Sequence, residues 1–195
     1  MKVSPKIVLA SSSPFRRVLL EKICSTFECA SADVDECQHD DESPINLSAR
    51  LANEKAHALA QQFPNHLIIG SDQVAMLGDA QLHKPGNSEN SIAQLKQSSG
   101  QQIVFYTSVC VLNSETSEYK TDVDICHVNM KSLTLSEIEQ YVSIDKPYGC
   151  AAAFKSEGLG IALFEKIEGD DPNALVGLPL IKLIQLLNHF DYKVL

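Results

Sequence analysis

The segment Lys6–Ile23 reads KIVLASSSPFRRVLLEKI, an apolar run followed by three serines, a proline and two adjacent arginines. Ile7–Ser11 predicts a short buried strand, because the apolar run is brief and ends at turn residues. Pro14–Cys24 predicts a helix, since Ser13 can cap its N-terminus and proline suits its first position. The apolar face of this helix is expected to consist of Val18, Leu19 and Ile23.

The rest of the chain first alternates between strands and helices and then becomes rich in strands. Further helices are expected at Pro44–Phe63, Ser88–Gln97, Thr134–Ile144 and Leu178–Phe190. Further strands are expected at Phe27–Ser31, His66–Gly70, Gln73–Leu77, Ala80–Leu82, Ile103–Leu112 and Tyr119–Met130, with Tyr148–Phe154 and Gly160–Glu165 also extended. This order predicts an α/β fold, a twisted mixed β-sheet flanked by helices.

Local signals fix several details of these elements. Ser43 is expected to cap the second helix, and Thr134–Glu137, which reads TLSE, forms a capping box for the fourth. The dipeptide Gly78–Asp79 between two apolar runs predicts a hairpin. The inward stripes are expected to be Leu47, Leu51, Ala58 and Leu59 in the second helix and Leu180, Leu183, Ile184 and Leu187 in the last.

Composition limits the class of protein. The 195 residues fit a single domain, 1–195, with room for two lobes. The net charge of −9 argues against a nucleic-acid polymer as partner, and no apolar run approaches the roughly 20 residues of a membrane span. We expect a cytoplasmic protein, because no signal-peptide core is present. The six cysteines contain no C-x-x-C pair, which predicts reduced thiols without structural zinc.

Polar residues follow two of the early strands. The sequences SSSPFRR and GSDQ come after the first and third strands, whose carboxyl ends would lie at one edge of a parallel sheet. We therefore expect Arg16, Arg17 and Asp72 to lie near one another. The helix N-terminus, the serines from Ser11 onward and the two guanidinium groups are suited to an anion, although Ser-Pro also begins many ordinary helices.

The acidic residues leave two roles open. Asp72 comes directly after an apolar run, where a carboxylate either binds a hard cation such as Mg²⁺ or orients a water molecule. The DVDE sequence, Asp33–Glu36, supplies further carboxylates, of which one could complete a sparse metal site. Taken alone, Lys55 and Lys84 resemble ordinary surface lysines.

The ordered set of motifs resembles the Maf family of nucleotide pyrophosphatases over nearly the whole chain. The motifs are LASSSPFRRVLL, VDE, NEKA, IIGSDQV, HKPG, FKSEGLGI and DPNALVGLPL. This resemblance implies a two-lobed α/β fold of the Maf and ITPase type with a central cleft, often in a homodimer. It also implies a metal-dependent hydrolase, using Mg²⁺ or Mn²⁺, that cuts a nucleoside triphosphate between its α and β phosphates.

The resemblance also implies roles for individual residues. Asp72 matches the catalytic proton acceptor, and Glu36 together with Asp72 matches the metal site. The phosphate-binding positions would be Ser11, Arg16, Arg17, Lys55 and Lys84. Attack at phosphorus adds charge to oxygens that are already anionic, so cations are suited to these positions.

Three residues bear on the choice of nucleotide. GSDQV and FKSEG resemble the branch that acts on 7-methyl-GTP, with Gln73 and Glu157 as specificity residues. Glu157 favours a cationic, N7-methylated guanine, and Phe15 stands where this branch commonly carries Trp, so it keeps a stacking face of weaker cation–π strength. The alternatives are a dTTP/UTP or broad-range enzyme, or a non-catalytic nucleotide-binding regulator of septum formation.

Overall fold

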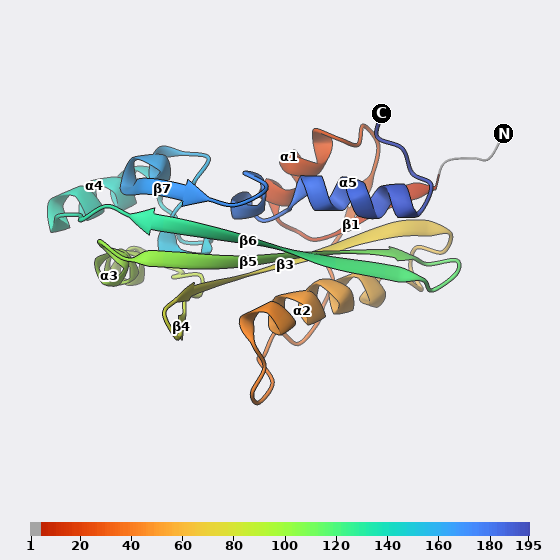
Figure 1. The fold of residues 1–195 in the computed structure, drawn as a ribbon, viewed down its shortest axis with the longest axis horizontal. Coiled ribbons are helices and arrows are strands. Elements are labelled where there is room, and N and C mark those ends of the chain that lie inside the picture. The colour runs from red at the N-terminus through yellow and green to blue at the C-terminus, as the bar shows by residue number, and fades with distance from the viewer. Residues whose placement is uncertain (1–4) are drawn as a thin grey trace. The chain divides into compact units, whose positions relative to one another are not determined.

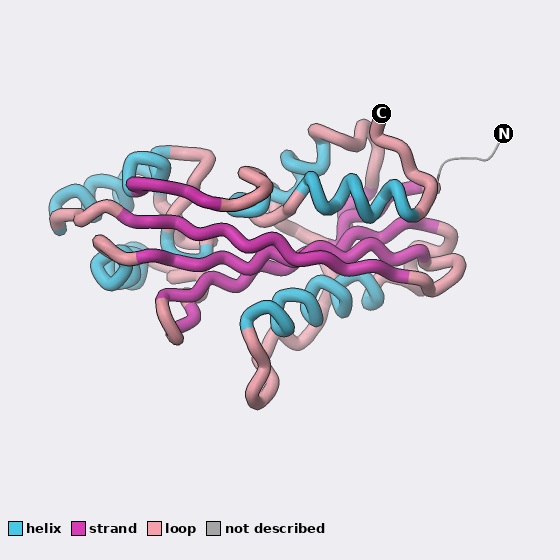
Figure 2. Tube along the Cα trace, in the orientation of Figure 1, coloured by secondary structure: helices cyan, strands magenta, loops and turns pink. Residues whose placement is uncertain are grey.

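The computed structural model describes residues 5–195, which form a seven-stranded mixed sheet with helices packed on it (Figures 1 and 2). The strands are β1 (Lys6–Ala10), β2 (Glu28–Ala30), β3 (His66–Leu77), β4 (Ala80–Gln81), β5 (Gln102–Asn113), β6 (Tyr119–Met130) and β7 (Phe164–Glu168). The helices are α1 (Pro14–Glu21), α2 (Pro44–Ala58), α3 (Ser88–Ser98), α4 (Leu135–Asp145) and α5 (Leu180–His189), with short 3-10 turns η1 (Ala151–Ala153), η2 (Leu159–Leu163) and η3 (Ala174–Val176).

The strand order is β2-β1-β3-β5-β6-β7, with β4 paired to β3. β1 is parallel to both β2 and β3, whereas β3–β4 and β6–β7 are antiparallel. The mixed α/β fold predicted from the sequence is therefore confirmed. The hairpin at Gly78–Asp79 is confirmed as well, because Leu77 pairs with Ala80 across it.

The chain divides into two compact units. Unit 1 comprises residues 1–73, 107–124 and 171–195, and unit 2 comprises residues 74–106 and 125–170. Strands β3, β5 and β6 contribute residues to both units.

Unit 1 is built in three layers, with α1 and α5 on one face of its strands and α2 on the other (Figure 1). The alternation of side chains along β1 produces this arrangement, since successive residues of a strand point to opposite faces. Ile7 and Leu9 pack with α1 and α5, while Val8 and Ala10 pack with α2. The Lys6–Ile23 segment therefore supplies both an inner strand of unit 1 and one of its covering helices.

Helices α1 and α2 of unit 1 begin where the sequence predicts, whereas α5 begins at Leu180, two residues after the predicted start at Leu178. Ser13 and Ser43 accept hydrogen bonds from the backbone N–H groups three residues later, as N-caps do. Two predicted inward residues are wrong: Val18 is 58% exposed and Ala58 is exposed. The faces that pack on the sheet instead include Leu20 in α1 and Ala52 and Ala56 in α2.

Unit 2 contains a cluster of three aromatic side chains, Phe105, Phe154 and Phe164. Phe154 makes edge-to-face contacts with Phe105 and Phe164, with ring centroids 5.5 and 4.7 Å apart. The capping box of α4 is confirmed, with Thr134 and Glu137 bonding reciprocally. The extended structure expected at Tyr148–Phe154 is wrong for most of its length, because these residues form turns and the 3-10 turn Ala151–Ala153. That expected at Gly160–Glu165 is wrong up to Leu163, because Leu159–Leu163 form a second 3-10 turn.

Strand β3 is longer than the sequence indicates. The sequence predicts an end at Gly70, yet the strand continues through Ser71 and Asp72 to Leu77. These polar residues remain in a buried strand because Ser71 has distant partners: its hydroxyl lies 2.8 Å from the Ser108 carbonyl and 3.0 Å from the Gly177 carbonyl. Asp72 therefore lies within a strand, not in a loop.

All six cysteines lie within the described residues and are free, with Cys24, Cys110 and Cys126 buried. Among the described helices, none combines the length and apolar character that crossing a membrane requires.

Candidate active site

The centre of the site is a buried ion pair in unit 1. The Lys55 Nζ on α2 donates to the Asp72 Oδ1 on β3 at 2.6 Å, and both residues are 8% exposed. Burying two charges is costly unless they are paired and hydrogen bonded, so this contact fixes both side chains against each other. Neither residue would occupy this position in an ordinary surface helix or strand.

Gly70 explains how α2 comes so close to β3. A Cβ atom at this position would lie 2.0 Å from the Ala52 carbonyl oxygen and 2.9 Å from the Ala56 backbone nitrogen. Only glycine permits this approach of helix to strand. Because Lys55 and Asp72 follow closely along the same two elements, the Gly70 contact sets the distance across which they pair.

Arg16 is held beside this pair by the backbone of a distant loop. Its Nε donates to the Gly177 carbonyl at 2.8 Å, the same carbonyl that Ser71 contacts. Arg16 also interacts electrostatically with Asp72 and with Glu36. The expected proximity of the first helix to Asp72 is thus found for Arg16.

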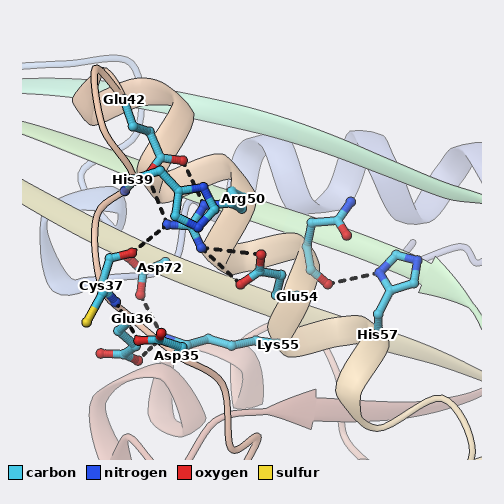
Figure 3. Close-up of polar contacts among 11 residues, drawn as sticks. Asp35, Glu36, Cys37, His39, Glu42, Arg50, Glu54, Lys55, His57 and Asp72 are labelled. Carbon is cyan, nitrogen blue, oxygen red and sulfur yellow. Dashed lines mark hydrogen bonds and ion pairs between the residues drawn. The ribbon is translucent and has the colours of Figure 1, made fainter.

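Glu36 approaches the pair from the segment between β2 and α2. Its Oε1 lies 2.5 Å from Lys55 Nζ, so one ammonium group contacts the carboxylates of Glu36 and Asp72 together (Figure 3). The side chain of Glu36 is 59% exposed, in contrast to 11% for Asp72. One carboxylate of the site is therefore buried and the other faces solvent.

The environment shifts the titration of the buried groups. Burial raises the pKa of the Asp72 carboxyl above its ordinary value, and the positive charges of Lys55 and Arg16 oppose this effect. Burial lowers the pKa of the Arg16 guanidinium, which the charges of Asp72 and Glu36 partly offset. A carboxylate with a raised pKa beside fixed cations has the properties of a proton acceptor.

Gln73 follows Asp72 and is anchored to the loop before α5. Its Nε2 donates to Thr107 Oγ1 at 3.0 Å and lies 3.0 and 3.2 Å from the carbonyls of Ala174 and Leu175. These bonds fix the orientation of the Gln73 amide. The segment that accepts them also contains Gly177, whose carbonyl binds Arg16.

The loop itself is held by Asp171, a residue that the sequence reasoning missed. Its Oδ1 accepts from the backbone and side-chain nitrogens of Asn173 at 2.8 Å, and its Oδ2 accepts from the Ile181 N–H at 2.6 Å. Asp171 is 1% exposed. Because it accepts from an N–H in the first turn of α5, it caps this helix from a residue outside it. The DPNALVGLPL motif contained this residue, but no local pattern indicated its partner ten residues later.

Three further predicted site residues come from α1 and the loop before it. Ser11 accepts a hydrogen bond from the Ser13 N–H at 3.1 Å, and Phe15 is half-buried in the first turn of α1. Arg17 is exposed and pairs with Glu21 one turn later at 3.2 Å. Arg17 therefore lies on the solvent side of α1 in this structure, whereas Arg16 contacts the loop.

Two predicted residues belong to unit 2. Lys84 is exposed in the loop after β4, and Glu157 is exposed in the turn between η1 and η2. Both act electrostatically on Cys150, whose pKa is raised to about 11, chiefly by burial and then by Glu157, while Lys84 opposes the shift. Lys84 and Glu157 thus belong to one neighbourhood of unit 2.

The donor set of unit 1 fits a cation only in company with other oxygens. Within residues 5–195 there is no group of three or more His, Cys, Asp or Glu side chains arranged for a metal ion. Glu36 and Asp72 nevertheless direct two carboxylates at one positive group. Mg²⁺ commonly takes one or two protein carboxylates and obtains its remaining ligands from phosphates and water.

The fold and site define an α/β protein with a buried acid–base pair beside an arginine. The chain matches the family model described as Maf-like protein over residues 6–190. It is 53% identical over 184 residues to the 7-methyl-GTP pyrophosphatase of Alcanivorax borkumensis, covering 94% of this chain and 93% of that protein. The chain therefore belongs to the Maf family.

Other relatives carry the same name. The 7-methyl-GTP pyrophosphatase of Colwellia psychrerythraea is 49% identical, covering 97% of this chain and 94% of that protein, and that of Nitrosococcus oceani is 48% identical, covering 98% and 96%. Among solved structures, the Ham1 protein of Staphylococcus aureus gives a TM-score of 0.48 at 14% identity over 95% of this chain and 99% of that chain, a similarity too low to add to the assignment.

Proposed function

We propose that this protein hydrolyses 7-methyl-GTP between its α and β phosphates, which yields 7-methyl-GMP and diphosphate. The observation that carries the proposal is the buried Asp72–Lys55 pair with Arg16 beside it, in a chain about half identical to proteins named 7-methyl-GTP pyrophosphatase. A buried carboxylate among fixed cations suits attack by water on a polyanion.

The chemistry assigns each group of unit 1 a role. Asp72 accepts a proton from the attacking water, and because Lys55 donates to Oδ1 we assign the proton to Oδ2. Lys55 and Arg16 offset the negative charge that develops on the phosphate oxygens. Ser11, which precedes α1, and Arg17 within it are further proposed phosphate-binding residues. Lys84 is proposed for the same role on the strength of the family resemblance.

A divalent cation is part of the proposal. Glu36 and Asp72 would hold Mg²⁺ or Mn²⁺ together with phosphate oxygens, in keeping with their convergence on Lys55 Nζ. When bound, such an ion neutralises charge on the polyphosphate. Lys55 already links the two carboxylates, so it keeps them oriented toward a common point.

Three residues would select the base. N7-methylation makes guanine cationic, which favours the carboxylate of Glu157 and the aromatic face of Phe15. The carboxylate also accepts hydrogen bonds from donors on the guanine edge. Gln73, oriented by its bonds to Ala174 and Leu175, would shape the pocket next to Asp72.

The test is a diphosphate-release assay on 7-methyl-GTP, GTP, dTTP and UTP with Mg²⁺ or Mn²⁺. We expect the highest kcat/KM for 7-methyl-GTP and no release after chelation by EDTA. A preference for dTTP or UTP would show that 7-methyl-GTP is not the main substrate. The proposed cleavage between the α and β phosphates would still hold. Nucleotide binding without hydrolysis of any triphosphate would overturn the enzymatic proposal and favour a regulator.

We further propose that the protein acts in the cytoplasm as a homodimer. The nucleoside triphosphate is the partner that the family and the cationic site support, while the net charge of −9 disfavours a nucleic-acid polymer. Light scattering coupled to size-exclusion chromatography would give the mass of the assembly directly, against 21.4 kDa for one chain.

A further inference from the structure

Glu36 reaches the active site from a segment with little apolar packing, in which the partly buried Ala32 contacts the core cluster on the α2 side. Residues 31–43 between β2 and α2 include no buried residue, and most of them are exposed. A loop of this kind is ordinarily mobile, because few contacts oppose its conformational entropy. The apolar contact of Ala32 lies four residues before Glu36, so polar contacts are needed to hold Glu36 at 2.5 Å from Lys55.

Arg50 supplies this restraint from α2. Its Nε and Nη2 donate to the two carboxylate oxygens of Glu42 at 2.7 and 2.9 Å, and Nη2 also donates to the Cys37 carbonyl at 2.9 Å (Figure 3). Paired contacts of a guanidinium with a carboxylate are both strong and directional. The Arg50 and Glu42 side chains are only 18% and 9% exposed, so water weakens this pair less than an ordinary surface pair.

The residue that follows Glu36, Cys37, is held through both its N–H and its carbonyl. The Cys37 N–H donates to Asp35 Oδ1 at 3.0 Å, and the Cys37 carbonyl accepts from Arg50. Because the two bonds flank the backbone next to Glu36, they limit its torsions. The same helix thus holds this backbone through Arg50 and the Glu36 side chain through Lys55.

Glu42 extends the restraint to the rest of the segment. Its Oε2 accepts from the His39 N–H at 3.1 Å, and its carbonyl accepts from Gln38 Nε2 at 2.6 Å. The hydrogen bonds from Arg50 hold the pKa of Glu42 at about 2, well below its ordinary value, so Glu42 is ionised at neutral pH. We call Arg50, Glu42 and the Cys37 carbonyl the Arg50 clamp.

We propose that Arg50 is a positioning residue for the reaction, acting through the Cys37 carbonyl and Glu42 to hold Glu36 against Lys55. Arg50 touches neither Asp72 nor Lys55 in the hydrogen bonds and ion pairs found among the described residues, so its effect on turnover is indirect. The inference rests on the proposed function, since it assigns Arg50 to the same site.

The neighbouring Glu54 offers a matched control. It pairs with Arg50 Nη1 at 3.1 Å along the helix and contacts no residue of the clamped segment in these bonds. Loss of Glu54 weakens a surface pair on α2 but leaves both clamp contacts of Arg50 intact. A purely helix-stabilising role of Arg50 would therefore be affected by Glu54→Gln much as by Arg50→Gln.

The experiment compares Arg50→Gln, Glu54→Gln, Glu36→Gln and the double variant Arg50→Gln/Glu36→Gln. We expect Arg50→Gln to lower kcat/KM by about 10- to 100-fold, as a displaced catalytic group does, and Glu54→Gln to change it less than about threefold. The double variant should fall no more than about twofold below Glu36→Gln, because residues acting through one contact are not additive.

Hydrogen–deuterium exchange adds a readout that does not depend on turnover. Peptides covering residues 33–43 should exchange faster in Arg50→Gln than in the wild type or Glu54→Gln, while peptides of β1 stay unchanged. Unchanged exchange in Arg50→Gln would overturn the proposal. So would a double variant whose fold loss in kcat/KM equals the product of the losses in the two single variants. If the wild type turns over no nucleotide, the proposed function fails and the exchange result still decides whether the clamp exists.

A second variant covers the case in which Arg50→Gln does not fold. Glu42→Gln keeps arginine on α2 and weakens only the charged part of the clamp. We expect it to shift exchange in residues 33–43 and kcat/KM in the same direction as Arg50→Gln, by a smaller factor. Wild-type values for both measurements in a folded Glu42→Gln protein would also reject the clamp.

Discussion

The candidate residues of unit 1 and unit 2 are held in different ways. Asp72 and Lys55 are buried, sit on a strand and a helix, and are bonded to each other. Lys84 and Glu157 lie in exposed loops and turns of unit 2. The buried pair of unit 1 is therefore fixed before any ligand binds, whereas the side chains of Lys84 and Glu157 are free to change conformation.

The largest effect is expected from Asp72→Asn. The change keeps the size of the side chain and removes its capacity to accept a proton, so kcat should fall by about 10²- to 10⁴-fold. Diphosphate release from 7-methyl-GTP measures this loss, and circular dichroism with a melting curve checks the fold. An Asp72→Asn protein of normal activity would remove Asp72 from the mechanism.

Gly70→Ala should disturb the buried pair of unit 1 by moving α2 away from β3. The added Cβ would meet the Ala52 carbonyl at 2.0 Å, so α2 must shift, at a cost of about 1–3 kcal/mol in the free energy of unfolding. Urea unfolding measures the cost, and kcat/KM reports the displaced Lys55. Gly149→Ala is the control, since a Cβ added there would meet no atom within 4 Å; equal losses in both variants would refute the close-approach explanation.

Glu157→Gln tests the proposed role of an exposed side chain of unit 2 in recognising the base. Removing the negative charge should lower kcat/KM for 7-methyl-GTP by about tenfold, which corresponds to about 1.4 kcal/mol, and should affect UTP much less, because UTP carries no cationic base. Steady-state kinetics with both nucleotides measures the ratio. Equal losses for the two substrates would remove Glu157 from base recognition.

The smallest expected effect is a displacement of the pH profile. A proton acceptor works when deprotonated, so kcat/KM should rise with pH through the pKa of Asp72, and burial places this acidic limb above the value of an ordinary aspartate, about 3.9. Lys55 lowers this pKa, so Lys55→Met should move the limb to higher pH. Lys166→Met, which removes an exposed lysine of unit 2, should leave it in place; a limb shifted to lower pH in Lys55→Met would contradict the assignment.

The sequence predicted elements whose signals are local. The caps at Ser13 and Ser43 and the Thr134–Glu137 box each involve partners three residues apart, so they were found correctly. The continuation of β3 through Ser71 was missed, because the carbonyls that satisfy its hydroxyl lie 37 and 106 residues away. The turn at Ala152 was missed because alanine rarely signals the positive φ of 59° found there.

In the candidate site, too, residues within motifs were predicted and residues that act through distant backbone groups were not. Motifs in the sequence pointed to Asp72, Lys55, Glu36 and Arg16, and the structure brings these four together, whereas Arg17 lies with Glu21. The supporting contacts could not be read from the sequence. Arg50 acts on a backbone carbonyl, and Asp171 on a backbone N–H, so neither partner is marked by its residue type.

The shared carbonyl of Gly177 has a consequence for how this protein can fail. Gly177 adopts a φ of +116°, which strongly favours glycine, and its oxygen orients Arg16 and contacts Ser71. A residue with no side chain thus governs the direction of a charged group 161 positions earlier. Inactivating substitutions should therefore arise at Gly177 although it carries no functional group, and they would resemble the loss of an arginine more than the loss of a turn.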